Sequence, residues 1–267
     1  MKKIIILAIL IVVTGIYLYQ KQESAVINID VPIAQEYQAF TTSTPDIEKE
    51  IEIIEEVLQR ASSSAKASKD RQDDEIVLID AINLDVPFTS QAPTANWGQP
   101  WQDACEEASV LMVDYYYQGT ALPGLVETES LLKDMTDWQI ENWGDHHNLT
   151  MEELAEFVEI TFGYQTELII DLTPDKVKEY LQTGLPVIVP ADGHKLNNPY
   201  FSNDGPDYHM LVIKGYSEDH FITNDPGTSW GAEFVYTSEN LFYSIAEWNQ
   251  KESQATGPKI GLVLNNN

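Results

Sequence analysis

The pattern of apolar and polar positions divides the chain into three stretches, of which the first is apolar. Residues 4–19 are apolar except for Thr14 and Gly15, and two lysines precede them. As a helix this run would span about 24 Å, close to the roughly 30 Å hydrocarbon core of a bilayer. The preceding lysines favour export of the chain that follows. No small-x-small cleavage site ends the run, which favours an uncleaved anchor over a signal peptide.

Residues 1–20 are therefore expected to be an N-terminal membrane anchor or signal segment. The localisation that follows is the cell membrane, with a single pass and an extracytoplasmic domain, or secretion if the segment is cleaved. The sequence gives no basis for predicting an oligomeric state.

The second stretch, residues 21–83, is rich in Ser, Thr, Gln and charged residues, as polar linkers are. We expect it to be a stalk. Residues 45–60 carry apolar positions at spacings of four, three and four, which predicts a helix with one apolar face. The apolar positions of this helix are Ile47, Ile51, Ile54 and Leu58.

The third stretch, residues 84–267, is expected to be one folded domain in which helices come first and strands follow. Helical spacing, the Thr150 cap with Glu153 and the Thr173-Pro174 start mark helices. Short apolar or β-branched runs between turns mark strands. This order is typical of the α+β class. The helices are expected at 104–118, 151–162, 173–184 and 238–248, and the strands at 185–190, 208–214, 221–223, 234–236 and 259–264.

The charge of the chain argues against one class of partner. Fifteen basic residues stand against 43 acidic ones, for a formal net charge of −28. A nucleic acid would be repelled by such a surface and would find few cations for its phosphates. We therefore expect no nucleic-acid partner. The acidic surface serves either to keep the protein soluble or to select a cationic substrate.

Cys105 is the only cysteine, so it forms no disulfide within the chain. A single thiol of this kind is either buried and structural or reactive. It stands at the start of the helix expected from residue 104, where unpaired backbone N–H groups and the helix dipole stabilise a thiolate. Cys105 is therefore a candidate nucleophile.

A thiolate nucleophile needs a base and a group that orients the base. His209 begins an apolar strand that turns at residues 215–219 and returns to Asp225. If the two strands pair, His209 falls opposite residue 225 or 226, within reach of the Asp225 carboxylate. That carboxylate would hold the imidazole in one tautomer and favour its charged form. Asn224 points to the opposite face.

These residues occur in a set of motifs that resembles a known family, the C39-like group of papain-like cysteine peptidases. The resemblance spans residues 84–264 and depends on the order of the motifs rather than on any single one. The motifs are Val-Pro-Phe-Thr-Ser-Gln at 86–91, Trp97, Ala104-Cys105 with a helix ending in Tyr-Tyr-Gln-Gly, Tyr208-His209, Gly215-Tyr216 and Asn-Asp-Pro-Gly at 224–227.

The resemblance implies an α+β, papain-like fold in which a helical half carrying the cysteine packs on an antiparallel sheet carrying the histidine and the aspartate. It implies that Cys105 is the nucleophile, His209 the general base and Asp225 the residue that orients it. It also implies that Gln91 donates to the oxyanion, with Gln102 in reserve. It implies no cofactor and no metal. The Asp-His-His run at 145–147 lacks the spacing of a metal site.

The function expected is that of a cysteine peptidase or amide hydrolase, with a peptide or another amide as substrate. Two alternatives stay open: a binding module that has lost turnover, and a cell-envelope acyltransferase that uses the same cysteine. Glu106 and Glu107, directly after Cys105, favour the binding module, because carboxylates there raise the thiol pKa.

Overall fold

The computed structural model describes residues 31–34 and 79–265. The apolar run at 1–20 and the helix expected at 45–60 lie outside these residues. Among the described helices, none combines the length and the hydropathy that a membrane span requires.

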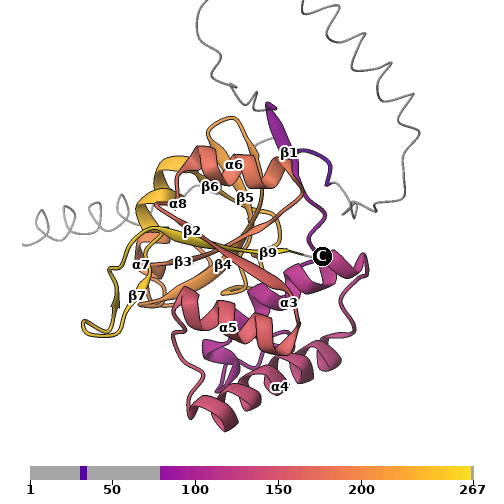
Figure 1. Cartoon of the computed structure of the whole chain (residues 1–267), viewed down its shortest axis with the longest axis vertical. Coiled ribbons are helices and arrows are strands. Elements are labelled where there is room, and N and C mark those ends of the chain that lie inside the picture. Colours follow the sequence, from indigo (N-terminus) through magenta and orange to yellow (C-terminus); the bar gives the residue numbers. More distant parts are fainter. Residues whose placement is uncertain (1–30, 35–78, 266–267) are drawn as a thin grey trace, which may run out of the picture. The chain divides into compact units, whose positions relative to one another are not determined.

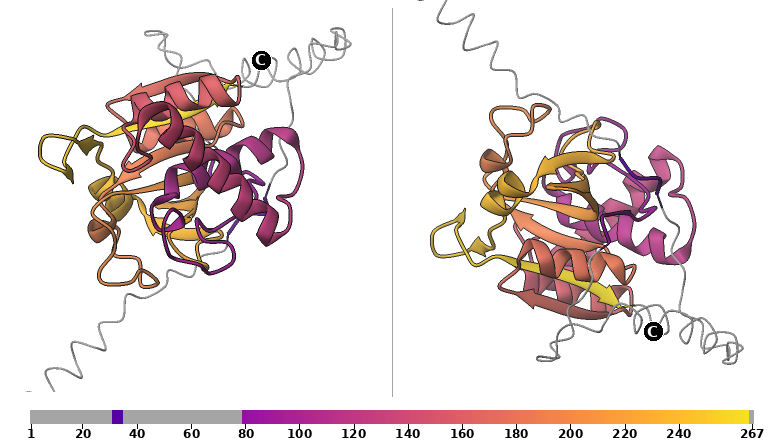
Figure 2. Two further views of the ribbon diagram at one scale, coloured as in Figure 1. Left: turned by 90° about the horizontal axis from the view of Figure 1, so that it is seen from below. Right: turned by 90° about the horizontal axis from the view of Figure 1, so that it is seen from above.

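The helices fall into two groups on either side of a sheet (Figures 1 and 2). α3, α4 and α5 form the helical half, and α6 and α8 lie with the strands. The bounds are η1 Trp101–Asp103, α3 Cys105–Gln118, α4 Leu125–Trp143, α5 Met151–Thr161, α6 Pro174–Gln182, α7 Gly193–Leu196 and α8 Ser238–Ser244.

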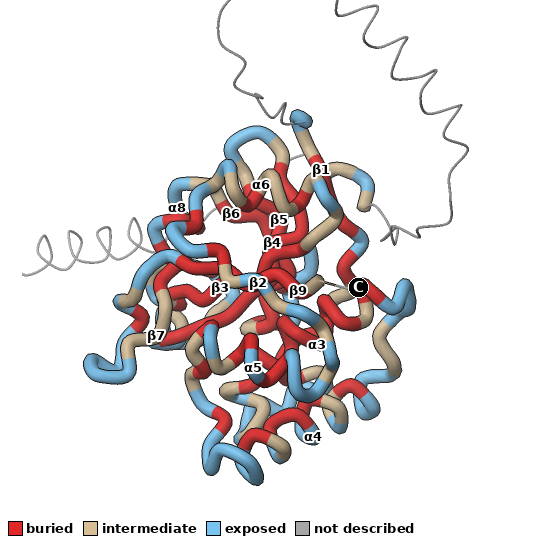
Figure 3. The backbone as a smooth tube through the Cα atoms, viewed as in Figure 1, coloured by how far each residue is buried: buried red, intermediate tan, exposed pale blue. Residues whose placement is uncertain are grey.

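The sheet has seven antiparallel strands in the order β2-β9-β3-β4-β5-β6, with β1 paired to β4 beyond the end of β3. β7 and β8 form a separate two-stranded sheet. Figure 3 shows that the central strands are buried along most of their length. The bounds are β1 Ala81–Asn83, β2 Gln165–Ile170, β3 Val187–Ala191, β4 His209–Ser217, β5 His220–Asn224, β6 Phe234–Thr237, β7 Trp248–Asn249, β8 Gln254–Ala255 and β9 Ile260–Asn265.

The expected α+β class is confirmed, and the local signals explain most of the helix ends. The Thr150 hydroxyl accepts from the Glu153 N–H while the Glu153 carboxylate accepts from the Thr150 N–H, which completes the predicted capping box. Thr173 caps α6, with Pro174 in its first turn. Gly119 ends α3 in the left-handed region at φ 62°, which glycine adopts without strain.

Helices cover both faces of the sheet at β2. Successive residues of a strand point to opposite faces, and here Thr166 donates to Glu159 of α5 whereas Glu167 accepts from Tyr180 of α6. α5 therefore covers one face and α6 the other. The apolar side chains between the layers form one core cluster, which includes Cys105.

The structure departs from the sequence predictions in several elements. η1, α4, α7, β2, β7 and β8 were not expected, and β1 lies within residues that the sequence assigned to the stalk. α8 ends at Ser244, not at residue 248, because Ile245 leaves the helix to form a β-bridge with Ala191.

Candidate active site

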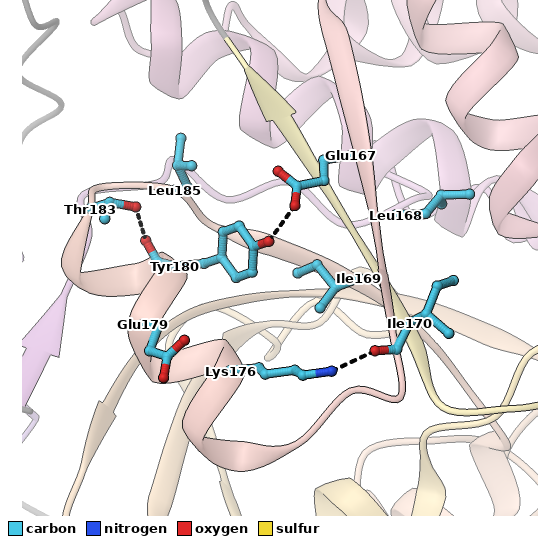
Figure 4. A pocket seen from close by; sticks show the side chains of 9 residues that line it. All are labelled: Glu167, Leu168, Ile169, Ile170, Lys176, Glu179, Tyr180, Thr183 and Leu185. Atoms are coloured by element: carbon cyan, nitrogen blue, oxygen red, sulfur yellow. Dashed lines mark hydrogen bonds between the residues drawn. The ribbon is translucent and has the colours of Figure 1, made fainter. Parts of the chain in front are cut away.

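Two hollows among the described residues are candidate sites. The larger, of about 500 Å³, lies between β2 and α6 and is drawn in Figure 4. In it Tyr180 donates to Glu167 at 2.5 Å, and burial together with that bond raises the pKa of Tyr180 to about 12. The residues that line it include neither cysteine nor histidine, and it shares none of them with the second hollow. Its described lining therefore offers neither a thiol nucleophile nor an imidazole base.

The second hollow is a cleft of about 290 Å³ between the start of α3 and the start of β4. Cys105, His209 and Gln91 all line it, so the chain brings together three residues that are up to 118 positions apart. Aromatic, amide and acidic side chains form the rest of its lining, and none of the described lining residues is Lys or Arg. This cleft is the candidate active site.

Cys105 is the first residue of α3, as the sequence predicts, and its side chain is buried. Its thiol donates to the Glu106 carboxyl at 3.0 Å. Among the described residues, no hydrogen bond joins the sulfur to His209. Burial and the Glu106 charge raise the pKa of the Cys105 thiol well above its usual value, and a backbone hydrogen bond from Met210 acts in the opposite direction.

The predicted pair of His209 and Asp225 is present. His209 Nε2 lies 2.7 Å from Asp225 Oδ1, and both side chains are buried. Burial alone would raise the pKa of Asp225, but the His209 charge and the hydrogen bonds to the carboxylate hold it below its usual range. Because His209 Nε2 is hydrogen-bonded to Asp225, His209 Nδ1 is the ring nitrogen left to accept a thiol proton.

The route by which the hairpin brings this pair together differs from the prediction. β4 and β5 continue to Ser217 and His220, with Glu218 in the left-handed region of the turn, so the hairpin is tighter than expected. The pairing ends with Val212 opposite Asn224, and the same register continued would put His209 opposite residue 227, not 225 or 226. Asp225 reaches the imidazole through its side chain.

Two residues that the sequence did not single out hold Asp225 in place. Tyr236 donates to Asp225 Oδ2 at 2.6 Å and Asn198 Nδ2 donates to it at 3.0 Å. The Gly227 N–H donates to Oδ1 at 3.0 Å. With His209, the carboxylate therefore accepts four hydrogen bonds. Asn224 instead donates to the carbonyl oxygen of Val86, in agreement with its predicted orientation.

Gln91 lies at the cleft, where the oxyanion role would need it. Its Nε2 donates to the carbonyl oxygens of Trp101 and Gln102, at 3.1 and 2.6 Å. Its backbone N–H donates to Pro226, next to Asp225. Its Oε1 is buried and has no partner among the described residues. The side chain of Gln102 lines the same cleft.

Residues 83–256, well over half of the chain, match the Peptidase_C39 like family. The chain belongs to that family. A comparison with curated proteins gave no match. The helical half that carries Cys105 and the antiparallel sheet that carries His209 and Asp225 form the papain-like arrangement expected of a C39-like peptidase.

Solved structures similar to this C39-like chain include three bacterial peptidases. A crystal structure described as that of a C39-like peptidase from Bacillus anthracis is 13% identical, covers 71% of this chain and 99% of its own, and has a TM-score of 0.45. A double-glycine-motif protease from an AMS/PCAT transporter, in complex with the leader peptide, is 17% identical, with coverages of 60% and 82% and a TM-score of 0.34. The peptidase domain of Streptococcus ComA is 13% identical, with coverages of 62% and 93% and a TM-score of 0.34.

A loop of the C39-like domain, residues 197–207, forms one wall of the cleft. Phe201 lines the cleft and meets the His209 ring edge-on, with centroids 5.2 Å apart. The far end of the loop contacts His194 of α7. The His194 ring lies 3.1 Å from the Asp204 carbonyl and 3.0 Å from the Asp207 carboxylate. Both partners only accept, so the imidazole must be charged to bond both. The bond to Asp207 raises the pKa of His194 accordingly.

Glu106 and Glu107 are both buried in this C39-like chain. Glu107 Oε1 accepts from Gln139 Nε2 at 2.7 Å, whereas Glu107 Oε2 and Gln139 Oε1 have no partner among the described residues. Both are acceptors, so a proton on Glu107 would supply a missing donor. Burial and the Glu106 charge raise the pKa of Glu107 well above its usual value.

Replacing Glu107 with Gln is expected to stabilise the protein, and more so at pH 8 than at pH 4. Because the folded pKa is raised, folded Glu107 keeps a proton that the unfolded chain loses above the ordinary pKa. The free energy of unfolding therefore falls as the pH rises from the ordinary to the raised pKa. Gln removes this loss, and Tm should rise by about 2–4 °C for each kcal/mol regained.

Thermal unfolding followed by circular dichroism at the two pH values tests this expectation. Glu156→Gln, at an exposed position on α5, is the matched control and should leave the pH dependence unchanged. A Glu107→Gln variant with the same pH dependence as the wild type would contradict the prediction.

Proposed function

We propose that the chain is an extracytoplasmic cysteine peptidase or amide hydrolase that acts through a Cys-His-Asp triad. In this proposal Cys105 attacks the amide carbonyl, His209 first accepts and then returns the proton, and Asp225 orients the imidazole. Gln91 donates to the developing oxyanion together with the Cys105 N–H, which requires its amide to leave the carbonyl oxygen of Trp101 or Gln102. The N-terminal segment, residues 1–20, holds the enzyme at the membrane.

One observation carries this proposal: the thiol and an imidazole already bonded to a buried carboxylate line the same cleft. Membership of the C39-like peptidase family supports amide hydrolysis as the reaction. The substrate class we propose is a peptide, by analogy with the leader peptide bound to the similar transporter protease. Asp103 lines the cleft and none of its described lining residues is Lys or Arg, which favours substrates with cationic groups near the bond that is cleaved.

One feature favours the alternative of a binding module without turnover: the partner to which the Cys105 thiol donates its hydrogen bond. It donates to Glu106 and not to the imidazole, and burial raises its pKa. Catalysis in this arrangement requires the thiol proton to turn from Glu106 towards His209.

Labelling with iodoacetamide separates the two functions. We expect stoichiometric labelling of Cys105 in the native 267-residue chain, at a rate that falls sharply in His209→Ala, because the imidazole no longer takes the thiol proton. Cys105→Ala is the control for specificity. A native protein that is not labelled, although its thiol reacts once unfolded, would support the binding module.

A further inference from the structure

Glu106 contacts the reacting sulfur directly, and none of the proposed triad roles uses it. Its Oε2 lies 3.0 Å from Cys105 Sγ, and its Oε1 accepts from the Leu149 N–H at 3.2 Å. Glu106 is 1% exposed. The carbonyl oxygen of a carboxylic acid is a better acceptor than its hydroxyl oxygen, so the bond from the Leu149 N–H favours Oε1 as the carbonyl oxygen. A proton on Glu106 would therefore sit on Oε2, the oxygen that faces the sulfur.

The surroundings of Glu106 offer no free basic side chain to pair with a carboxylate. Glu107 lies beside it on α3, Asp103 acts on Glu107 from η1, and it is faced by His209 at the start of β4 and by Tyr208 just before that strand. Glu247 acts on Tyr208 in turn. His209 is the one basic side chain in this group, and it is already paired with Asp225.

The energetic consequence follows from burial. A buried carboxylate without a partner of opposite charge is neutralised by taking up a proton. Burial raises the pKa of Glu106 accordingly, and the bonds to Cys105 and Leu149 oppose the rise only in part.

We propose that Glu106 is a further catalytic residue, a neutral carboxylic acid whose Oε2–H donates a hydrogen bond to the Cys105 thiolate. The inference rests on Cys105 being the nucleophile. When the thiol S–H bond breaks, its proton passes to His209 Nδ1, which becomes charged. Glu106 keeps its own proton and turns it towards the sulfur, so that the sulfur changes from donor to acceptor in the same contact. The negative charge on the sulfur then has a donor beside it instead of a second anion.

The proposed role belongs to the neutral acid form of Glu106 and not to its carboxylate form. A carboxylate would oppose thiolate formation, whereas a neutral acid assists it. Gln is the matched substitution, because its amide can donate to the sulfur and accept from Leu149 but cannot ionise. Leu fills a similar volume and offers no donor.

The rate of iodoacetamide labelling of the full chain, measured from pH 5 to 9, tests the inference. We expect Glu106→Gln to label within about fivefold of the wild type near pH 6, and Glu106→Leu to label at least about tenfold more slowly. At alkaline pH the wild-type rate should fall below that of Glu106→Gln, because ionised Glu106 then opposes the thiolate. Circular dichroism establishes that each variant is folded, and if the Leu variant does not fold, the alkaline difference between wild type and Gln decides alone.

Three results would overturn the role of Glu106. If both variants label faster than the wild type near pH 6, Glu106 is an inhibitory carboxylate. If both label at the wild-type rate, Glu106 has no role in the reaction. If both label equally slowly, Glu106 is an obligatory proton acceptor. A wild-type chain that is not labelled at any pH would instead refute Cys105 as nucleophile, so the two failures are distinguishable.

Discussion

Replacing Asp225 with Asn is expected to lower the rate of catalysis by about 10³ to 10⁴-fold while leaving the protein folded. Asp225 accepts from four donors, of which His209 and Gly227 meet Oδ1 and Asn198 and Tyr236 meet Oδ2. An Asn side chain replaces one of these oxygens with an NH₂ group, which then faces donors. At the Oδ1 position it would force His209 into the tautomer that carries its proton on Nδ1. That tautomer cannot accept the thiol proton.

Steady-state hydrolysis of a peptide substrate and the labelling rate of Cys105 both measure this effect. Tyr236→Phe is the matched control, because it removes one of the four donors but keeps the charge. It should cost about tenfold or less. Retention of more than a tenth of the wild-type rate by Asp225→Asn would contradict the proposed orienting role.

Replacing Gly227 with Ala is expected to lower the rate of catalysis by about a hundredfold, because it displaces the catalytic imidazole. A methyl group there would lie 2.8 Å from both His209 Cε1 and Phe201 Cε1, which is too close for carbon atoms. The ring must therefore move, and a displacement of about 1 Å at a reacting group costs on the order of a hundredfold.

Gly124→Ala provides the comparison, since its methyl group would meet only the flexible end of Glu127. The pair is measured by labelling of Cys105 and by hydrolysis, with Tm as a check on folding. Equal rates for the two variants would show that the His209 ring position is not critical.

The elements that the sequence predicted well are those with local signals. The caps of α5 and α6 and the stop at Gly119 depend on residues within one turn of the helix end. α4 ends at a left-handed glycine, Gly144, but its start lacks such a signal, because its N-cap Gly124 makes no side-chain bond and much of its buried face is polar. The polar members of that face are Thr128, Thr136 and Gln139.

β2 was missed for a different reason. It is an edge strand, paired only with β9, and most of its residues are half-buried or exposed. The start of β2 therefore lacks the apolar run that marked the central strands. The pairing that makes it a strand comes from residues 260–265, almost a hundred positions later.

The candidate site was predictable as far as residue chemistry and chain order determine it. Cys105 at a helix start and His209 on a strand next to Asp225 follow from local pattern. The predicted rise in the thiol pKa beside Glu106 is confirmed. The contacts from Asn198 and Tyr236 to Asp225 were not predictable, because they depend on how distant loops and strands pack.

The wall of the cleft and the orienting acid are parts of one connected structure. Asn198, at the start of the 197–207 loop, bonds Asp225, and Phe201 in the same loop lies against the His209 ring. A ligand that presses on this wall therefore strains the hydrogen bonds that hold the orienting carboxylate. Recognition of a substrate and activation of the base are mechanically linked, so loop substitutions that never touch the sulfur should alter affinity and turnover together.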